Sequence, residues 1–403
     1  MVELDDILAA QNELADIARR TPIDYSHTFS DMTGAEVHLK LEMFQRTGSF
    51  KIRGATNRIR SLTDEEKENG VVTASAGNHA QGVALAASRS GVDAKVVMPE
   101  SAAVSKINAT QSYGAEVILY GDDYNEAQSK AHQIESEENR TYVHAFNDEK
   151  VIAGQGTIGL EIIEDISDVD TVVVPIGGGG LISGVATAIK AKNPETRVIG
   201  VQAAGAASVA TSLEKGEIYQ IDEVNTIADG IATRKIEPLT FEIIKDQVDE
   251  VVTVSDQEIA IAVMLLLERG KTLVEGAGAV PLAALLNERF EFTDGEVIVP
   301  VLSGGNIDMN QLTTVLMRGL IEAGRYLKIC TELPDRPGSL DRLLDIIAEQ
   351  RANIYAIQHD RTSRDTAVNA AEVEIELETR GQEHVNTLLN ELKSAGYDVE
   401  VLS

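Results

Sequence analysis

Residues 171–181 read Thr-Val-Val-Val-Pro-Ile-Gly-Gly-Gly-Gly-Leu, a β-branched run that leads directly into four glycines. The consecutive valines predict a strand buried on both faces, since a strand with one exposed face alternates polar and apolar residues. A second apolar strand is expected at 198–201, and residues 181–192 between them are typical of a helix. A helix that joins two apolar strands indicates a parallel sheet covered by helices.

A similar series lies earlier in the chain, from about residue 71 to about residue 120. The two series, 71–120 and 171–201, predict two α/β lobes in one unit. In open sheets of this kind a ligand binds at the carboxyl ends of the strands, where the glycine-rich turns of this chain fall. The first series is expected to contain strands at 71–73, 95–99 and 116–120, and helices at 80–88, at 106–113 and up to about 139.

Further elements flank the two series. The segment Asp5–Arg20 reads as an amphipathic helix that Pro22 stops. Ser255 and Glu258 have the spacing of a capping box, which predicts a helix to about Arg269. Two more strands are expected at 37–41 and 297–302, and one more helix at 54–62.

The pattern changes after about Ala323. Short alternating strands and amphipathic helices then follow in the order βαββαβ, which is the ferredoxin-like unit. About 80 residues are enough for a separate domain, so we expect one domain at 1–322 and another at 325–403. The elements of the second are expected at 327–333, 340–351, 353–359, 370–379, 382–395 and 397–402.

Composition points to a globular, cytoplasmic protein. The chain has 403 residues, of which 43% are apolar. It has no apolar run of about 18 residues that would predict a membrane-spanning helix. Its acidic N-terminus differs from a secretory signal, and the single Cys330 excludes an intrachain disulfide.

The net charge of −30 narrows the choice of partners. A surface this acidic disfavours nucleic acid and anionic membranes as partners. Salt screens the repulsion between like charges, so our hypothesis is a halophilic protein from a salt-rich cytoplasm. A melting temperature that stays the same between dilute buffer and molar salt would contradict it.

Lys51 is the first candidate functional residue. Phe50 and Ile52 flank it, and Arg53 is close in sequence. A lysine becomes nucleophilic when desolvation or a neighbouring cation disfavours its charged form. A solvated lysine at a helix start explains the same residues equally well, so this segment alone leaves both interpretations open.

Gly177–Gly180 form the second candidate site. Successive glycines let backbone N–H groups approach a small anion, and the following helix adds its favourable N-terminal charge. No Gly-Lys-Thr/Ser follows, and Ile182 and Ser183 take the third position of the dinucleotide pattern Gly-x-Gly-x-x-Gly. We predict a phosphate-binding turn, with a purely structural tight turn as the alternative.

Two more segments of small residues follow expected strands. Ser75-Ala76-Gly77-Asn78-His79 can surround a carboxylate with backbone and side-chain donors. Its histidine is either a base or, more commonly at a helix start, an orienting residue. Ser303-Gly304-Gly305-Asn306 places a hydroxyl at the end of the 297–302 strand, although a plain turn would look the same.

Together these four motifs suit pyridoxal phosphate, which needs a lysine, a phosphate site and a partner for its ring nitrogen. Because the four motifs occur in this order, the chain resembles the threonine/serine dehydratases of the β-family of pyridoxal-phosphate enzymes, from about residue 10 to about residue 320. The resemblance implies a two-lobed α/β tryptophan-synthase-β-like fold (fold type II), with the smaller lobe at about 45–145. The tail, with its turn at 335–340, resembles an α+β ACT regulatory domain.

The resemblance also implies a role for each matching residue. Lys51 would hold the cofactor as an imine and later remove the Cα proton, Ser303 would face the pyridine nitrogen, and Glu275 would lie near the cofactor. The implied cofactor-binding residues are Phe50, Lys51, Asn78, Gly177, Gly178, Gly179, Gly180, Leu181 and Ser303; the implied substrate-binding residues are Ser75, Gly77, Asn78 and His79; the implied effector-binding residues are Arg336, Gly338, Ser339 and Leu340.

The implied reaction is the deaminating dehydration of L-threonine to 2-oxobutanoate and ammonia, with L-serine to pyruvate as a second activity. Serine racemases of the same fold carry a serine where this chain has Ala76, which makes racemisation the weaker alternative. β-Replacement is another alternative on this fold. A non-catalytic amino-acid sensor is an alternative of a different class.

Metal, effector and assembly follow from the resemblance as well. Gln202, Ala206 and Ser208 stand where some relatives carry metal-binding carboxylates, so we expect no metal site. The tail implies feedback by isoleucine or valine, as in isoleucine biosynthesis, unless it only mediates assembly. We expect a homo-oligomer, either a dimer or a tetramer.

Overall fold

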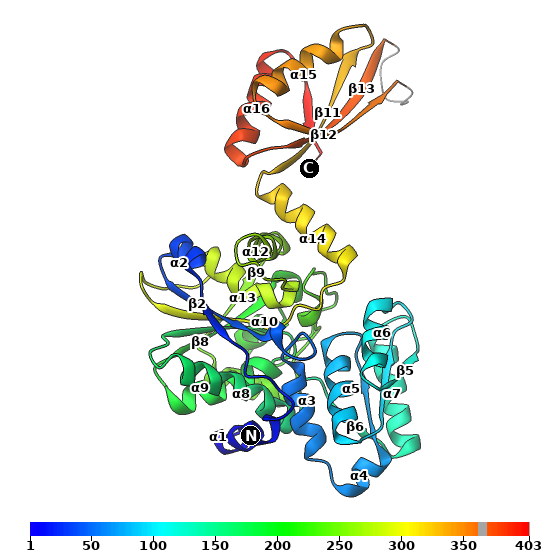
Figure 1. Ribbon diagram of the computed structural model, residues 1–403, viewed down its shortest axis with the longest axis vertical. Coiled ribbons are helices and arrows are strands. Elements are labelled where there is room, and N and C mark those ends of the chain that lie inside the picture. Colours follow the sequence, from blue (N-terminus) through cyan, green and yellow to red (C-terminus); the bar gives the residue numbers. More distant parts are fainter. Residues whose placement is uncertain (362–368, 403) are drawn as a thin grey trace. The chain divides into compact units, whose positions relative to one another are not determined.

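The computed structural model describes residues 1–361 and 369–402, which form two compact units, Met1–Leu312 and Thr313–Ser403 (Figure 1). The boundary lies inside helix α14 (Met309–Glu322), whereas the sequence-based boundary falls at the end of that helix. An unbroken helical pattern gives no sign in the sequence of where its packing partners change.

Six strands form the sheet of the larger lobe, in the order β1-β2-β10-β7-β8-β9, and all neighbours are parallel except β1 and β2. The valines at 172–174 are fully buried in β7, at the centre of this sheet. Helix α9 packs on β7 and β8, and α13 covers β7 to β10 from the other side (Figure 1). The strands are β1 Ile23–Tyr25, β2 Glu36–Leu41, β7 Thr171–Pro175, β8 Arg197–Ala203, β9 Glu250–Val254 and β10 Val297–Leu302; the main helices are α1 Leu4–Leu14, α8 Glu149–Asp165, α9 Gly180–Lys192, α12 Asp256–Glu268 and α13 Gly276–Leu286.

Helix α8 is the longest helix of this unit among the described residues, and the sequence did not predict it. Its glycines lower the helix propensity of the segment, but they are what lets neighbouring helices approach. A methyl group on Gly154 would lie 2.6 Å from the Cα of Gly54, and one on Gly159 would lie 2.8 Å from the Cβ of Ala188. Close packing therefore stabilises a helix that propensity alone disfavours.

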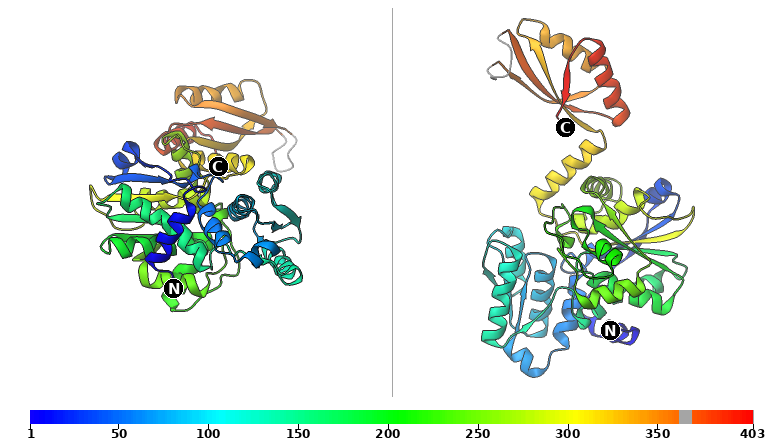
Figure 2. Two further views of the ribbon diagram at one scale, coloured as in Figure 1. Left: turned by 60° about the horizontal axis from the view of Figure 1, so that its bottom comes forward. Right: turned by 180° about the vertical axis from the view of Figure 1, so that it is seen from behind.

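The smaller lobe contains four parallel strands in the order β5-β4-β3-β6 (Figure 2). Alternate residues point to opposite faces, so Val71 packs with helix α5 whereas Val72 packs with helix α7. The prediction of two α/β lobes is thus confirmed, although the two-residue strand β6 was missed. The elements are β3 Val71–Ala74, β4 Ala94–Met98, β5 Glu116–Leu119, β6 Thr141–Tyr142, α5 Asn78–Ser90, α6 Val104–Ser112 and α7 Tyr124–Glu138.

The predicted helix Asp5–Arg20 is wrong in its length, because α1 ends at Leu14. Tertiary hydrogen bonds draw the following residues away: Arg19 N donates to Gln45 Oε1 at 2.8 Å, and Gln45 Nε2 donates back to Arg19 O at 2.8 Å. The remaining elements of the unit are α2 His27–Thr33, α3 Lys51–Arg60, α4 Asp64–Asn69, α10 Ser208–Lys215, α11 Pro238–Gln247 and the short 3₁₀ helices Glu42–Phe44, Ala204–Ala206 and Asp229–Ile231.

The second unit follows the predicted βαββαβ order, with an antiparallel sheet ordered β12-β13-β11-β14. Its core is formed by the inward faces of β11 and β13 together with both helices. The last strand is shorter than predicted. The elements are β11 Tyr326–Pro334, α15 Ser339–Glu349, β12 Asn353–Asp360, β13 Ala370–Glu378, α16 Gln382–Ser394 and β14 Val399–Val401.

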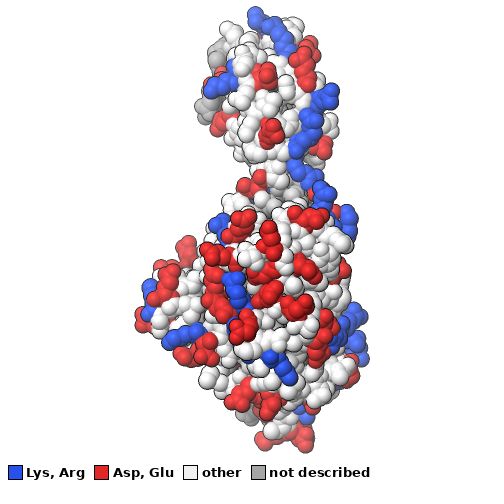
Figure 3. Space-filling view, turned by 90° about the vertical axis from the view of Figure 1, so that its left-hand side faces the viewer, with Lys and Arg blue, Asp and Glu red and all other residues white. Residues whose placement is uncertain are grey.

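Acidic side chains are spread over the face shown in Figure 3, with fewer basic ones between them. This distribution is that of a solvated surface. Within the described residues, no helix is long and apolar enough to cross a membrane.

Candidate active site

A cavity of about 830 Å³ lies in the first unit, at the carboxyl ends of β3, β7 and β10. Both lobes contribute to its lining. The predicted cofactor and substrate residues that line it are Phe50, Lys51, Ser75, Gly77, Asn78, His79, Gly177, Gly178, Gly179, Gly180, Leu181, Glu275 and Ser303. The predicted effector residues Arg336, Gly338, Ser339 and Leu340 belong to the second unit, at the turn between β11 and α15.

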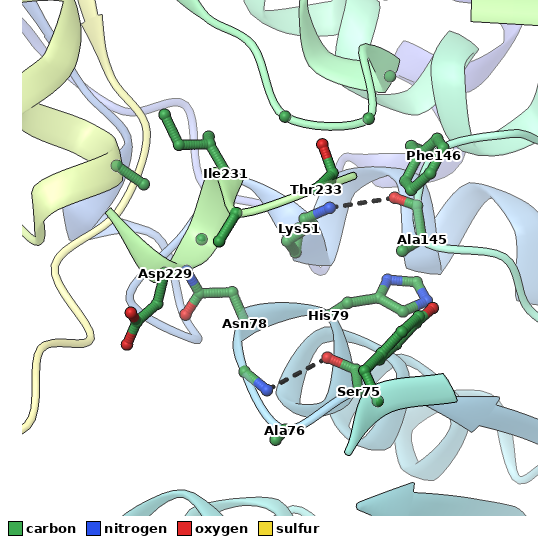
Figure 4. Close-up of a pocket in the computed structure, with 18 of the residues that line it drawn as sticks. Lys51, Ser75, Ala76, Asn78, His79, Ala145, Phe146, Asp229, Ile231 and Thr233 are labelled. Atoms are coloured by element: carbon green, nitrogen blue, oxygen red, sulfur yellow. Dashed lines mark hydrogen bonds between the residues drawn. The ribbon is translucent and has the colours of Figure 1, made fainter. Parts of the chain in front are cut away.

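Lys51 is the first residue of helix α3, and its amine faces the cavity (Figure 4). The Nζ atom donates to Ala145 O at 3.0 Å and lies 5.1 Å from the ring centroid of Phe50. Desolvation lowers the pKa of Lys51 to about 8, although the more distant Glu275 carboxylate opposes this shift. A substantial neutral fraction near pH 8 would allow this amine to act as a nucleophile or a base.

A buried ion cluster fixes helix α3 two residues further on. The Arg53 guanidinium donates to Glu42 at 2.8 and 2.9 Å and to Glu161 at 2.7 and 2.9 Å, and it also donates to Thr157 Oγ1 at 3.0 Å. Lys40 Nζ donates to Glu161 at 2.6 Å. Two cations and two carboxylates balance one another out of water, so the start of α3 is held rigidly.

The four glycines between β7 and α9 occupy space that no side chain could share. A methyl group on Gly177 would lie 2.9 Å from the Cα of Ile231, and one on Gly180 would lie 2.8 Å from the Cβ of Phe146. Gly179 has a φ of +88°, which disfavours other residues. The turn therefore presents its backbone directly to the cavity, at the N-terminus of the 13-residue helix α9.

The Ser75–His79 loop joins β3 to α5 at the same cavity. Gly77 N donates to Ser75 Oγ at 3.2 Å, as the lower dashed line in Figure 4 marks. His79 Nε2 donates to Val143 O at 3.0 Å, and burial lowers the pKa of His79 to about 3. His79 is therefore neutral at ordinary pH, with Nε2 protonated, and contributes no positive charge to a carboxylate site.

Asn78 connects the loop to the other lobe. Its Nδ2 donates to Glu275 Oε1 at 2.6 Å, and its Oδ1 accepts from Asn306 Nδ2 at 2.8 Å. Burial raises the pKa of Glu275 to about 7, although the hydrogen bond from Asn78 opposes the shift. Ser303 O accepts from Phe50 N at 3.1 Å, which ties the end of β10 to the start of α3.

These residues fit pyridoxal phosphate. A glycine turn with bare backbone suits the phosphate, and a partly neutral lysine suits the aldehyde. The buried hydroxyl of Thr233, which also lines the cavity, has no hydrogen-bond partner among the described residues. A cavity of this size is typical of a cofactor and a small substrate together.

Several cavity residues carried no motif in the sequence. Ala145 and Phe146 follow strand β6, and Asp229, Ile231 and Thr233 belong to a loop without a strand before it. The parallel pairing of β6 with β3 could have pointed to the first two, since the ends of parallel strands meet at one edge.

Gln202, at one of the positions where relatives carry metal ligands, is used within the chain. Its Nε2 donates to Ala206 O at 2.9 Å, and its Oε1 accepts from Val209 N at 2.9 Å. Over residues 1–361 and 369–402, no three His, Cys, Asp or Glu side chains are grouped so that they could hold a metal ion.

Comparisons with known proteins agree with this chemistry. The family model "Pyridoxal-phosphate dependent enzyme" matches residues 14–304. The chain is 48% identical over 402 residues to the L-threonine ammonia-lyase of Thermotoga maritima, which covers 100% of both chains. It is 52% identical over 396 residues to that of Geobacter sulfurreducens, which covers 98% of both. The solved structure of processed threonine deaminase isoform 2 from Solanum lycopersicum superposes with a TM-score of 0.75 at 39% identity, over 78% of this chain and 92% of that one.

Proposed function

The chain belongs to the family of pyridoxal-phosphate-dependent enzymes, and on that premise we propose that it converts L-threonine to 2-oxobutanoate and ammonia. The observation that carries the proposal is the meeting of three groups in one cavity: the Lys51 amine, the Gly177–Gly180 turn and the Ser75–His79 loop. The two relatives that match the whole chain are named for this activity.

Pyridoxal phosphate, when bound, supplies an aldehyde that reacts with amines and a ring that accepts negative charge from Cα. The backbone N–H groups of Gly177–Gly180 would hold its phosphate at the start of α9. Asn78 and Ser303, from the β3–α5 loop and the end of β10, would hold its ring. Ser303 is neutral and so would not enforce protonation of the ring nitrogen.

Lys51 moves the proton on which the reaction depends. Its amine accepts the proton from Cα of the substrate, which it can do because a pKa of about 8 leaves a neutral fraction at neutral pH. Ala145 O accepts from Nζ at 3.0 Å and so fixes the amine in the cavity before the cofactor binds. The Ser75–His79 loop orients the substrate carboxylate through N–H and hydroxyl donors, with His79 neutral.

Ala76 supports elimination over racemisation. Racemisation needs a second group that returns a proton to Cα from the face opposite Lys51. Alanine has no hydroxyl with which to do this, so residue 76 supplies no such donor. We further propose L-serine as a second substrate, since the missing methyl changes the binding free energy by only about 1–3 kcal/mol.

One experiment tests the activity. The visible absorbance of the purified protein reports the lysine-bound cofactor, and addition of L-threonine or L-serine should release 2-oxoacid. Retained absorbance without 2-oxoacid would favour the amino-acid sensor, and product only with added sulfide would favour β-replacement. Appearance of D-serine would favour the racemase.

We propose that the second unit is an ACT domain that regulates the first, through isoleucine or valine bound at the Arg336–Leu340 turn. The antiparallel β12-β13-β11-β14 sheet with two helices supports this. Calorimetric titration with each amino acid, together with initial rates, tests it; the absence of both heat and a kinetic effect would leave the unit an assembly domain. We also propose a cytoplasmic homo-oligomer, whose mass light scattering would measure.

The acidic surface supports a further proposal, that the protein is adapted to high salt. The net charge is −30, and on the face shown in Figure 3 the acidic side chains are spread out rather than gathered in one patch. Screening should then raise the melting temperature by several degrees between dilute buffer and molar salt. An unchanged melting temperature would exclude this adaptation.

A further inference from the structure

The first turn of helix α14 contacts the cavity directly. Gln311 lies in this turn and lines the cavity, outside every motif described above. Its Nε2 donates to Ile227 O at 3.2 Å and to Asp229 Oδ2 at 3.1 Å. The loop at 227–231 is thus attached through one side chain to a helix that continues past Leu312 into the second unit.

The 227–231 loop forms one wall of the cavity. Figure 4 shows Asp229 and Ile231 on one side of Lys51 and Asn78, with Ala145 and Phe146 on the other. A methyl group on Gly177 would lie only 2.9 Å from the Cα of Ile231, so the wall touches the phosphate-binding turn.

The same wall touches the residue before helix α13. A methyl group on Gly230 would lie 2.9 Å from the Cβ of Ala277 and 3.5 Å from Glu275 Oε1. A shift of the wall by a fraction of an ångström therefore reaches both the phosphate-binding turn and Glu275.

Among the described residues, side chains outside the wall hold it by hydrogen bonds at two places. Asp256, at the start of α12, accepts from Thr226 Oγ1 at 2.7 Å and from Ile227 N at 3.0 Å, which fixes where the loop begins. Further along, among the described residues, the hydrogen bond to the exposed Asp229 carboxylate comes from Gln311. The position of the middle of the wall thus depends on helix α14.

The smaller lobe is attached to the same turn. Asp308, immediately before α14, accepts from Asn310 N at 2.9 Å through Oδ1 and from Ser105 Oγ at 3.1 Å through Oδ2. Ser105 lies on helix α6 of the smaller lobe. Both lobes that enclose the cavity therefore form hydrogen bonds with residues at the start of α14.

We propose that Gln311 is a positioning residue: by holding Asp229 and Ile227 it sets the cavity wall at 227–231 and so contributes to cofactor and substrate binding without touching the reacting atoms. The cofactor half of the proposal needs only family membership, whereas the substrate half rests on the proposed threonine reaction.

The test compares Gln311→Leu with a matched control, Gln133→Leu. Gln133 makes the same kind of bond, Nε2 to Glu137 Oε1 at 2.7 Å, on an exposed helix surface that does not line the cavity. Loss of an amide–carboxylate hydrogen bond should raise the dissociation constant of pyridoxal phosphate, titrated into the apoenzyme, about three- to tenfold in Q311L and leave Q133L unchanged. The KM for L-threonine should rise similarly, with kcat within about threefold.

A double-mutant comparison separates positioning from general damage. If Gln311 acts through Asp229, Asp229→Asn should weaken cofactor binding, and Q311L/D229N should bind no more weakly than the weaker single variant. Wild-type cofactor affinity in Q311L, or effects that multiply in the double variant, would overturn the proposal. Because cofactor affinity is measured without substrate, the comparison remains decisive even if L-threonine is not turned over.

Gln311→Glu keeps the proposal testable if the leucine variant does not fold. It keeps the shape of the side chain but places a second carboxylate against Asp229, so repulsion between like charges should displace the wall and raise the dissociation constant of the cofactor. Wild-type cofactor affinity in Q311E would contradict the contact.

Discussion

Lys40 is fully buried and Lys51 is partly buried in the first unit, and the surroundings of their amines differ in one respect. Lys40 Nζ lies 2.6 Å from a Glu161 oxygen and 2.8 Å from Thr21 O. Lys51 Nζ lies 3.0 Å from Ala145 O, with no carboxylate at hydrogen-bond distance among the described residues. The first amine has an anion in contact and the second has only a neutral carbonyl.

This difference in surroundings distinguishes a lysine that stabilises the fold from one that is suited to chemistry. A carboxylate in contact stabilises the charged amine, so Lys40 joins Arg53, Glu42 and Glu161 in a balanced cluster that holds helix α3. A carbonyl accepts a hydrogen bond from either form of the amine, so desolvation prevails and lowers the pKa of Lys51 to about 8. The cluster holds helix α3, whereas the Lys51 amine, which we propose as the reactive group, has no carboxylate in contact among the described residues.

The largest expected effect comes from removing the reactive amine. Lys51→Ala should abolish the visible absorbance of the lysine-bound cofactor and reduce turnover of L-threonine by at least about 10³-fold, since nucleophile and base are lost together. Its melting temperature should stay near that of the wild type, because no ion pair is broken. Retention of either the absorbance or the turnover in the purified variant would refute the assignment of Lys51.

Removing the structural amine should have the opposite signature. Lys40→Met leaves the buried cluster with an extra negative charge and should lower the free energy of unfolding by about 3–5 kcal/mol. Denaturant unfolding measures this, and cofactor absorbance should persist below the transition. The control is Lys67→Met, whose exposed pair with Asp64 at 4.0 Å should contribute less than about 1 kcal/mol. A Lys40 variant no less stable than this control would show that the cluster is dispensable.

The contrast between the two lysines could not be read from the sequence. Lys40 lies in an alternating strand pattern and Lys51 in a small-residue segment. The ion pair that distinguishes Lys40 depends on Glu161, which lies in the unpredicted helix α8. That helix was missed because its glycines look like turn residues until the helices against which they pack are known. Strands with continuous valines were predictable because their pattern needs no partner to be interpreted.

The candidate site shows the same division. Segments at strand ends with unusual composition, such as Gly177–Gly180 and Ser75–His79, were identified from sequence and share one cavity. Phe146, Asp229 and Gln311 were not, because each reaches the cavity through tertiary packing of a segment with ordinary composition. The neutral state of His79 likewise depends on its burial.

The pH dependence of cofactor attachment also tests the difference between Lys51 and Lys40. The pKa of Lys51 is lowered from the ordinary 10.5 to about 8, so the reactive neutral form gains about tenfold per pH unit below 8 and is complete above it. The rate at which apoenzyme regains visible absorbance with added cofactor should follow this curve. Lys40→Met should show the same midpoint as the wild type. A rate still rising tenfold per unit between pH 9 and 10 would mean that Lys51 titrates like a solvated lysine.

The smallest expected effect comes from Glu275, whose carboxylate acts on the Lys51 amine from a distance. Glu275 favours the charged amine, so Glu275→Gln should lower the pKa of Lys51 below about 8 and speed cofactor attachment about two- to threefold. The difference in attachment rate between E275Q and the wild type should be confined to the range between pH 7 and about pH 9. Below pH 7 Glu275, with its pKa raised to about 7, is itself protonated, and above about pH 9 Lys51 is neutral in both proteins.

Glu250→Gln provides the control, since Glu250 is exposed on strand β9 and does not line the cavity. It should leave the rate unchanged at every pH. An E275Q variant that speeds attachment equally at pH 6 and pH 8 would show that Glu275 acts by its shape or its hydrogen bond to Asn78 and not by its charge. Removal of a carboxylate in contact with an amine would change the charge of that amine far more than removal of a distant one. A rate change of only two- to threefold, confined to a narrow pH range, would therefore show that Lys51, unlike Lys40, has no carboxylate in contact.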